Sequence, residues 1–277
     1  MEELYEVGFL GEGINDAPAL KAANVALAVD HASDIARDVS DIVLLKRDLS
    51  YIIDGIREGR RILVNNAKYI TTTLASNFGN FYAVAVISLL VPYLPMLPVQ
   101  ILLVNLLSDF PMISIATDSV HDRELAKPIR YDLREILILS IVLGLVSSVF
   151  DFIFFGIFRT WGESTLQTGW FIESIITEIL LIYAVRNKAF ILQLLPPSGE
   201  IVFMTIVAIA ATVLIPFTGM GQQIFQFVTL NNQQLLLIAG IAASYFFTSE
   251  CVKMMYFKLI HTPHLTGKNS GNYRKFS

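Results

Sequence analysis

The chain has 277 residues, of which 54% are hydrophobic and only 16% are charged, and its mean hydropathy is +0.59. Soluble domains carry about 25% charged residues, so this composition excludes a chain that is soluble throughout. A net charge of −4 does not favour a nucleic-acid partner, and the single cysteine, Cys251, excludes an internal disulfide or a Cys-pair zinc site.

The first 60 residues read as a soluble α/β segment. Short apolar runs at 7–10, 25–29 and 41–45 are bounded by polar or turn residues and predict buried strands. Pro18 fits the first turn of a helix, and residues 33–39 predict one or two further helical turns. This alternation is typical of a parallel α/β sheet. Sixty residues are too few for a complete domain of this kind, so a partial, Rossmann-like domain is predicted.

The remainder of the chain, 61–260, is predicted to be an α-helical polytopic membrane domain. Neither 69–108 nor 201–249 contains an Asp, Glu, Lys or Arg. A spanning helix needs about 20 apolar residues, so each of these windows can hold two. Together with the apolar segments between them, they predict six spans, at residues 69–91, 99–116, 136–158, 170–185, 201–217 and 235–257.

Basic residues predict the orientation of these spans. They occur at 123–134, at 186–188 and in the last residues of the chain, whereas the opposite loops hold only Arg159. Loops rich in Lys and Arg stay in the cytoplasm. We therefore expect an integral protein of the cell (plasma) membrane with both termini cytoplasmic and with a cytoplasmic tail at 261–277.

Segment 11–18, with the sequence GEGINDAP, is the most specific string. It is a glycine-bounded turn that places the amide of Asn15 and the carboxylates of Glu12 and Asp16 beside a helix N-terminus. Backbone N–H groups there attract phosphate, and carboxylate oxygens suit Mg²⁺. A glycine turn by itself is equally consistent with a structural loop.

The whole string resembles the hinge motif Gly-Asp-Gly-x-Asn-Asp-x-Pro in the HAD-like phosphorylation domain of P-type ATPases. In that family the first carboxylate binds the catalytic Mg²⁺, and the Asn-Asp pair contacts the phosphorylated aspartate and orders the site. The resemblance implies that Asn15 and Asp16 are catalytic and that Glu12 and Asp16 hold the catalytic Mg²⁺.

The resemblance extends along the chain. Segment 32–45 is similar to the stretch leading to the family's last sheet strand, segment 59–66 to the stalk of its fifth membrane helix, and the six spans to the last six of ten. Four further segments look most like the magnesium-transporting pumps, at residues 76–80, 92–98, 127–132 and 169–173. The resemblance implies an ATP-driven pump that transports Mg²⁺.

Two departures accompany this resemblance. Glu12 stands where the family has Asp, and the extra methylene moves the carboxylate in a site that demands near-ideal octahedral geometry. The Asp-Lys-Thr-Gly phosphorylation motif, the nucleotide-binding domain and the first four membrane helices have no counterpart in this sequence. We therefore expect the C-terminal part of a pump, in which another region, such as a separate N-terminal half, binds ATP.

Polar residues inside the predicted spans form a second constellation. Asn105 and Asp109, four apart, share one helix face, as do Asn77 and Asn80, three apart. The family builds its cation site from these two helices and one that has no counterpart here. We predict Asn80, Asn105 and Asp109 as ligands of the transported cation, with Asn77 next, because such oxygen atoms suit Mg²⁺ or Ca²⁺. Hydrogen bonding between helices is the alternative, and it fits Asn77 better than Asp109.

Four other acids are weaker candidates. Glu178 lies deep in the fourth span and is expected near the cation site. Glu173, about 140° away around that helix, is expected at its outer end, where it reaches the interface. Asp151 is expected either to pair with Arg159 or to cap the outer end of its span. Glu250 is expected to be structural, beside a nearby lysine.

Three interpretations stay open. The chain is the C-terminal part of a cation pump, a truncated or degenerate membrane remnant that does not pump, or a passive transporter with a soluble regulatory segment. Segment 11–18 weighs against the third, because a passive transporter has no use for an Mg²⁺–phosphate site.

Overall fold

The computed structural model describes residues 6–46, 48–126, 132–187 and 196–260. The chain divides into two compact units, one on each side of the peptide bond between Arg60 and Arg61. The predicted tail at 261–277 and most of the segment at 127–132 lie outside the described residues.

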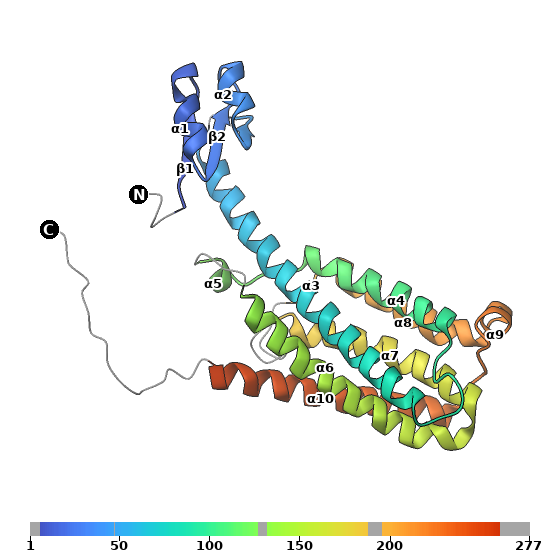
Figure 1. Cartoon of the computed structure of the whole chain (residues 1–277). Helices are drawn as coiled ribbons and strands as arrows, with labels where there is room; N and C mark the ends of the chain where they lie inside the picture. Colours follow the sequence, from blue (N-terminus) through green and yellow to red (C-terminus); the bar gives the residue numbers. More distant parts are fainter. Residues whose placement is uncertain (1–5, 47, 127–131, 188–195, 261–277) are drawn as a thin grey trace, which may run out of the picture. The chain divides into compact units, whose positions relative to one another are not determined.

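The first unit is built around three parallel strands, of which β1 and β2 are labelled in Figure 1. The strand order is β1-β2-β3, with Gly8 opposite Val25 and Leu27 opposite Ile42. The predicted parallel strands are therefore confirmed, and the run at 41–45 forms a shorter strand. The elements are β1 (Gly8–Gly11), η1 (Ile14–Asp16), α1 (Ala17–Ala22), β2 (Val25–Val29), α2 (Asp34–Asp38) and β3 (Ile42–Leu44).

Local signals in the sequence explain the short helices of this unit. Pro18 lies in the first turn of α1, where its missing N–H would have had no partner. Ser33 caps α2, since its Oγ accepts a hydrogen bond from the N–H of Ala36 at 3.3 Å. Leu20 and several alanines, among them Ala28 and Ala36, pack into a small core against the sheet.

The second unit is a bundle of long helices (Figure 1). α7 is the central helix, packing against α4, α6, α8 and α10, and 78% of its most apolar stretch is buried. The helices are α3 (Ser50–Ser88, which begins in the first unit), α4 (Pro98–Ile113), η2 (Ser114–Thr117), α5 (Asp122–Leu125), α6 (Leu133–Phe158), η3 (Arg159–Trp161), α7 (Glu163–Val185), α8 (Gly199–Leu214), η5 (Ile215–Phe217), α9 (Gly219–Ile224) and α10 (Asn232–Ile260).

Five helices among the described residues are long and apolar enough to cross a membrane: α4 with η2, α6 with η3, α7, α8 with η5, and α10. They correspond to five of the six predicted spans, so the chain is an integral membrane protein. The other predicted span, 69–91, is helical as far as Ser88 within α3. It is less apolar because Thr, Ser and Asn side chains interrupt it, as at Asn77 and Asn80. A membrane crossing by this segment stays a prediction.

Two glycines allow α3 and α6 to cross at close range. A Cβ atom on Gly79 would lie 2.7 Å from Ser147 Cβ, and one on Gly144 would lie 3.0 Å from the carbonyl oxygen of Ala75. The contact also carries hydrogen bonds, because Ser148 Oγ lies 3.2 Å from the carbonyl oxygen of Gly79. This crossing holds α3 against the bundle.

Candidate functional site

The loop between β1 and α1 carries the motif residues of the first unit. Asp16 Oδ2 accepts hydrogen bonds from the backbone N–H groups of Glu12, at 3.0 Å, and Gly13, at 2.9 Å. These donors favour the ionised carboxylate, so the pKa of Asp16 is lowered from its ordinary value. A Cβ atom on Gly11 would lie 2.8 Å from Asp16 Cβ. Glycine at position 11 therefore leaves the space in which Asp16 closes the loop.

This geometry gives the three predicted motif residues different environments. One oxygen of Asp16 is engaged by the loop itself, whereas Glu12 and Asn15 are exposed. Among the described residues there is no group of three or more His, Cys, Asp or Glu that could hold a metal ion. The loop therefore offers one exposed carboxylate and one exposed amide. The catalytic roles stay predictions.

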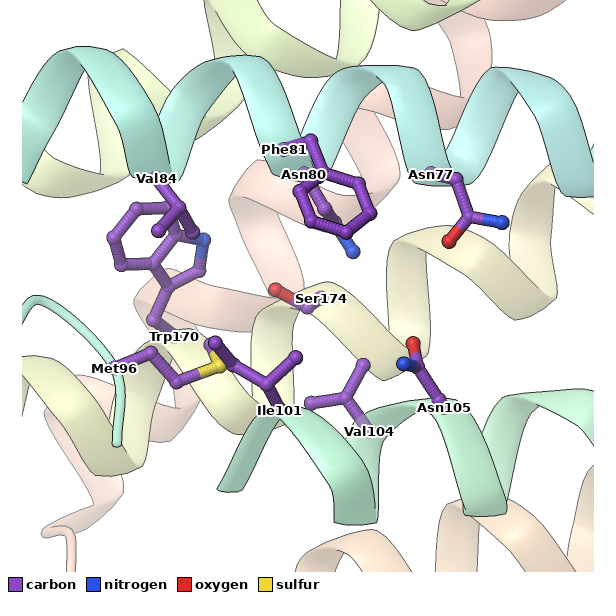
Figure 2. Close-up of a pocket in the computed structure, with 10 residues that line it drawn as sticks. All are labelled: Asn77, Asn80, Phe81, Val84, Met96, Ile101, Val104, Asn105, Trp170 and Ser174. Atoms are coloured by element: carbon purple, nitrogen blue, oxygen red, sulfur yellow. The ribbon is translucent and has the colours of Figure 1, made fainter. Parts of the chain in front are cut away.

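A small pocket lies between α3, α4 and α7 in the bundle (Figure 2). Figure 2 shows Asn77 and Asn80 of α3 facing Asn105 of α4 and Ser174 of α7 across the gap. The cavity measures about 70 Å³, whereas one water needs about 10–15 Å³ by that measure. It therefore has room for an ion or for several waters. Its other lining residues are Phe81, Val84, Met96, Ile101, Val104 and Trp170.

A carboxylate connects to this pocket through Asn80. The Nδ2 of Asn80 donates a hydrogen bond to Glu178 Oε1 on α7 at 2.5 Å, and Glu178 is buried. The amide nitrogen of Asn80 is engaged by Glu178, so Oδ1 is the atom of this side chain that is available to coordinate a cation. The contact places Glu178 beside Asn80, a predicted ligand, and a role for Glu178 near a cation site stays a prediction.

The predicted ligands do not all meet in the pocket. The structure brings together Asn77, Asn80 and Asn105, but Asp109 is not among the residues that line the cavity. Four residues advance a helix by about 6 Å and 40° beyond a full turn, which carries Asp109 away from the level of Asn105. Both Asn105 and Asp109 are exposed on α4. Their shared helix face is therefore open in this chain.

Two expectations about the other acids are wrong. Glu173 does not reach an interface, because it is 1% exposed inside the bundle. Asp151 neither pairs with Arg159 nor caps its helix; its Oδ1 accepts a hydrogen bond from Trp170 Nε1 at 2.8 Å. Packing of α6 on α7 decides both contacts, and helix periodicity within one span carries no information about it. The available signal was Trp170, at the start of the predicted span 170–185, since a buried indole N–H needs an acceptor such as a nearby acid.

Sequence reasoning also missed an ion pair. Arg186, just after α7, binds both oxygens of Asp118, with Nε–Oδ2 at 2.9 Å and Nη2–Oδ1 at 2.7 Å. Lys68 Nζ lies 3.9 Å from Oδ2 of the same carboxylate, and Asn65 Nδ2 donates to the Asp118 carbonyl at 3.0 Å. The available signal was an acid directly after one span and an arginine directly after another on the same predicted side. This contact joins α3, the end of η2 and the end of α7.

Comparison with known proteins gives the family. The model of the family described as "Cation transporting ATPase, C-terminus" matches residues 93–255. The chain is 35% identical over 261 residues to the magnesium-transporting ATPase, P-type 1, of Escherichia coli strain K12, and this match covers 92% of the chain and 29% of that protein. The corresponding protein of Salmonella typhimurium strain LT2 is 34% identical over the same lengths.

A calcium-transporting ATPase of Bacillus subtilis strain 168 is 37% identical over 119 residues, which cover 42% of this chain and 13% of that protein. The chain thus spans 29% of the length of the magnesium-transporting relatives but matches them over 92% of its own. The chain belongs to the cation-transporting P-type ATPases, corresponds to their C-terminal part, and resembles the magnesium-transporting members along most of its length.

Proposed function

We propose that this chain is the C-terminal part of an ATP-driven pump that moves a hard divalent cation, Mg²⁺, across the membrane. The observation that carries the proposal is the pocket in which Asn77, Asn80 and Asn105 of two different helices face one another (Figure 2). Amide and carboxylate oxygens suit hard cations better than soft ones. The magnesium-transporting relatives favour Mg²⁺ as the substrate.

The pocket is lined by neutral asparagine amides, and two carboxyl groups lie near it. Mg²⁺ binds through few protein ligands and keeps several waters, which agrees with a cavity of about 70 Å³. Asp109 supplies a carboxylate on the same face of α4 as Asn105, and Glu178 lies behind Asn80. We infer that Asn80, Asn105 and Asp109 contribute ligands, and that a further helix of the complete pump closes their open face.

The first unit contributes to the phosphoryl chemistry in this proposal. A catalytic Mg²⁺ would supply positive charge that offsets the developing negative charge of phosphoryl transfer. Glu12 offers the exposed carboxylate for this ion, Asn15 offers an amide to a phosphorylated aspartate on another region, and Asp16 holds the loop in shape. ATP binding belongs to that other region, either in the same polypeptide or in a separate N-terminal half.

We also propose six crossings of the plasma membrane with both termini in the cytoplasm. The support is the position of the basic residues, since Arg186 and the last turn of α10, with Lys258, lie on the side that the Lys/Arg rule assigns to the cytoplasm. The segment 69–88 of α3 then crosses with its Asn side chains turned toward the pocket instead of toward lipid. The partners are therefore the lipid bilayer and the transported cation.

A chimera tests the proposal against a remnant that does not pump. The chain is joined in frame behind the N-terminal part of the Escherichia coli relative and expressed in a strain that lacks its own Mg²⁺ transporters. We expect growth at limiting Mg²⁺ from the chimera and none from the chain alone. The relative's own C-terminal part, rejoined at the same point, is the positive control. Failure of the chimera beside a working control would favour the remnant.

Substitutions in the chimera test the ligands. Asp109→Asn keeps size and hydrogen bonding but removes a charge on which a divalent cation relies. We expect it to raise the Mg²⁺ concentration needed for growth about tenfold, which corresponds to about 1.4 kcal/mol. Glu200→Gln, an exposed acid in the first turn of α8, should leave the requirement unchanged. An unchanged requirement in Asp109→Asn would make Asp109 structural.

A further inference from the structure

Two carboxyl groups meet inside the bundle where α6 packs on α7. Asp151 is 2% exposed and Glu173 is 1% exposed, and the two groups lie within hydrogen-bonding reach of each other. Neither belongs to the ligand set proposed above. A pair of acids at this depth needs an explanation, because an isolated ionised carboxylate in a low-dielectric interior is very costly.

The partners of the pair are incomplete. Asp151 Oδ1 accepts the hydrogen bond from Trp170 Nε1, but Asp151 Oδ2 and Glu173 Oε2 are both buried without a hydrogen-bond donor. Buried polar atoms are otherwise nearly always hydrogen-bonded. Two ionised carboxylates cannot donate to each other, so one proton is the smallest addition that turns one oxygen into a donor and the other into its acceptor.

Within the described part of the chain, the surroundings of the pair supply no countercharge. Among the described residues, the titratable groups that interact electrostatically with the pair are Glu178 of α7 and Tyr245 of α10. Glu178 adds negative charge, and Tyr245 is neutral when protonated. Two like charges in contact without a cation do not both ionise, so the electrostatics and the missing donor point in the same direction.

We propose that Asp151 and Glu173 form a proton-binding pair in the membrane core, in which one proton is shared between the two carboxyl groups. The pair carries one negative charge when the proton is bound and two negative charges when the proton has left to solvent. Trp170 connects this site with the pocket, because its ring lines the cavity while its N–H binds Asp151. The pair therefore lies one side chain away from the proposed path of the cation.

Infrared spectroscopy of the full chain in lipid nanodiscs tests the proposal. A protonated carboxyl group has a C=O stretching band that a carboxylate lacks and that shifts in D₂O. We expect this band at neutral pH in the wild type. Asp151→Asn and Glu173→Gln should each remove the whole contribution of the pair, since the new amide N–H takes the place of the shared proton. Two independently protonated acids would instead lose half of the band in each variant.

Matched variants assign the band. Glu178→Gln measures the contribution of the buried acid that interacts with the pair from further along α7, and Glu200→Gln, which removes an exposed acid, should change nothing. Exchanging the two acids, with Asp151→Glu and Glu173→Asp in one chain, retains both carboxyl groups and should retain the band. Circular dichroism monitors the fold of each variant. Absence of the band in the wild type overturns the proposal whatever the variants do, and so does a band that persists undiminished in both folded single variants.

Discussion

The loop after β1 and the contact between α6 and α7 both contain carboxyl groups, but the hydrogen-bond donors to these groups come from different places. Asp16 accepts two backbone N–H groups from residues within four positions of itself. In α6 and α7 the backbone N–H groups are committed to the helices, so Asp151 depends on a side chain 19 positions away. An acid in a loop is therefore satisfied locally, whereas an acid in a helical bundle needs partners that only tertiary packing brings to it.

Removing an ion-pair partner that is distant in the sequence should have the largest effect on the free energy of unfolding. Arg186→Met keeps much of the apolar stem but leaves Asp118, which is 1% exposed, without its bidentate partner. Loss of one member of a buried ion pair costs about 3–5 kcal/mol. We expect that decrease in the free energy of unfolding of the detergent-solubilised chain, measured by titration with a denaturing detergent.

Arg134→Met is the control for this change. Arg134 lies exposed in the first turn of α6, and exposed charges contribute about 0–1 kcal/mol. Equal losses in the two variants would show that the Asp118–Arg186 contact has no special weight, and the contrast between local and long-range partners would fail.

Backbone contact between helices should give the next largest effect. Gly144→Leu places a side chain where the carbonyl oxygen of Ala75 lies 3.0 Å from the first added atom. Overpacking of this kind costs about 1–3 kcal/mol. Gly156→Leu is a matched control in the same helix, because a Cβ atom at Gly156 meets nothing within 4 Å. There we expect no loss and up to about 1 kcal/mol of gain from helix propensity. A similar loss at both positions would contradict the close crossing.

The smallest effect concerns Asp16, whose partners are local. Its pKa is lowered by the backbone N–H groups of Gly13 and Glu12, so the ionised form stabilises the folded loop. This contribution is present above the ordinary pKa of 3.8 and is lost as the pH falls through the lower folded value. Carbon-13 NMR of the side-chain carboxyls should show a titration midpoint for Asp16 below 3.8. A midpoint at or above that value would mean that the loop is not closed by Asp16.

The same contrast between local and long-range contacts explains which features of the fold can be predicted from the sequence. Hydropathy and turn residues predict helix ends to within a few positions, as for Pro98 at the start of α4 and Phe158 at the end of α6. β2 occupies the predicted residues 25–29. These features depend on neighbours in the chain, and so does the loop motif at 11–18.

Prediction succeeds less well where two helices must meet. Asn77, Asn80 and Asn105 share a pocket as helix faces suggested, yet the position of Asp109 outside its lining depends on how α4 is rotated against α3 and α7. The burial of Glu173 and the partner of Asp151 follow from the packing of α6 on α7, and spacing within one span cannot encode it. The crossing by residues 69–91 stays a prediction, because the polar side chains of α3 that line the pocket also make this helix less apolar.

Lys253 shows how the last helix of the chain holds a buried charge. This lysine is 1% exposed in α10, where its Nζ donates to Glu250 Oε1 and to the carbonyl oxygen of Ala184, each at 2.8 Å. The two side chains form a pair without net charge, which lowers the cost of burying either of them inside the bundle. Because chains are made from the N-terminus, Ala184 is synthesised and available before Lys253 leaves the ribosome. The carbonyl oxygen that accepts from Lys253 therefore belongs to a helix that is synthesised before α10.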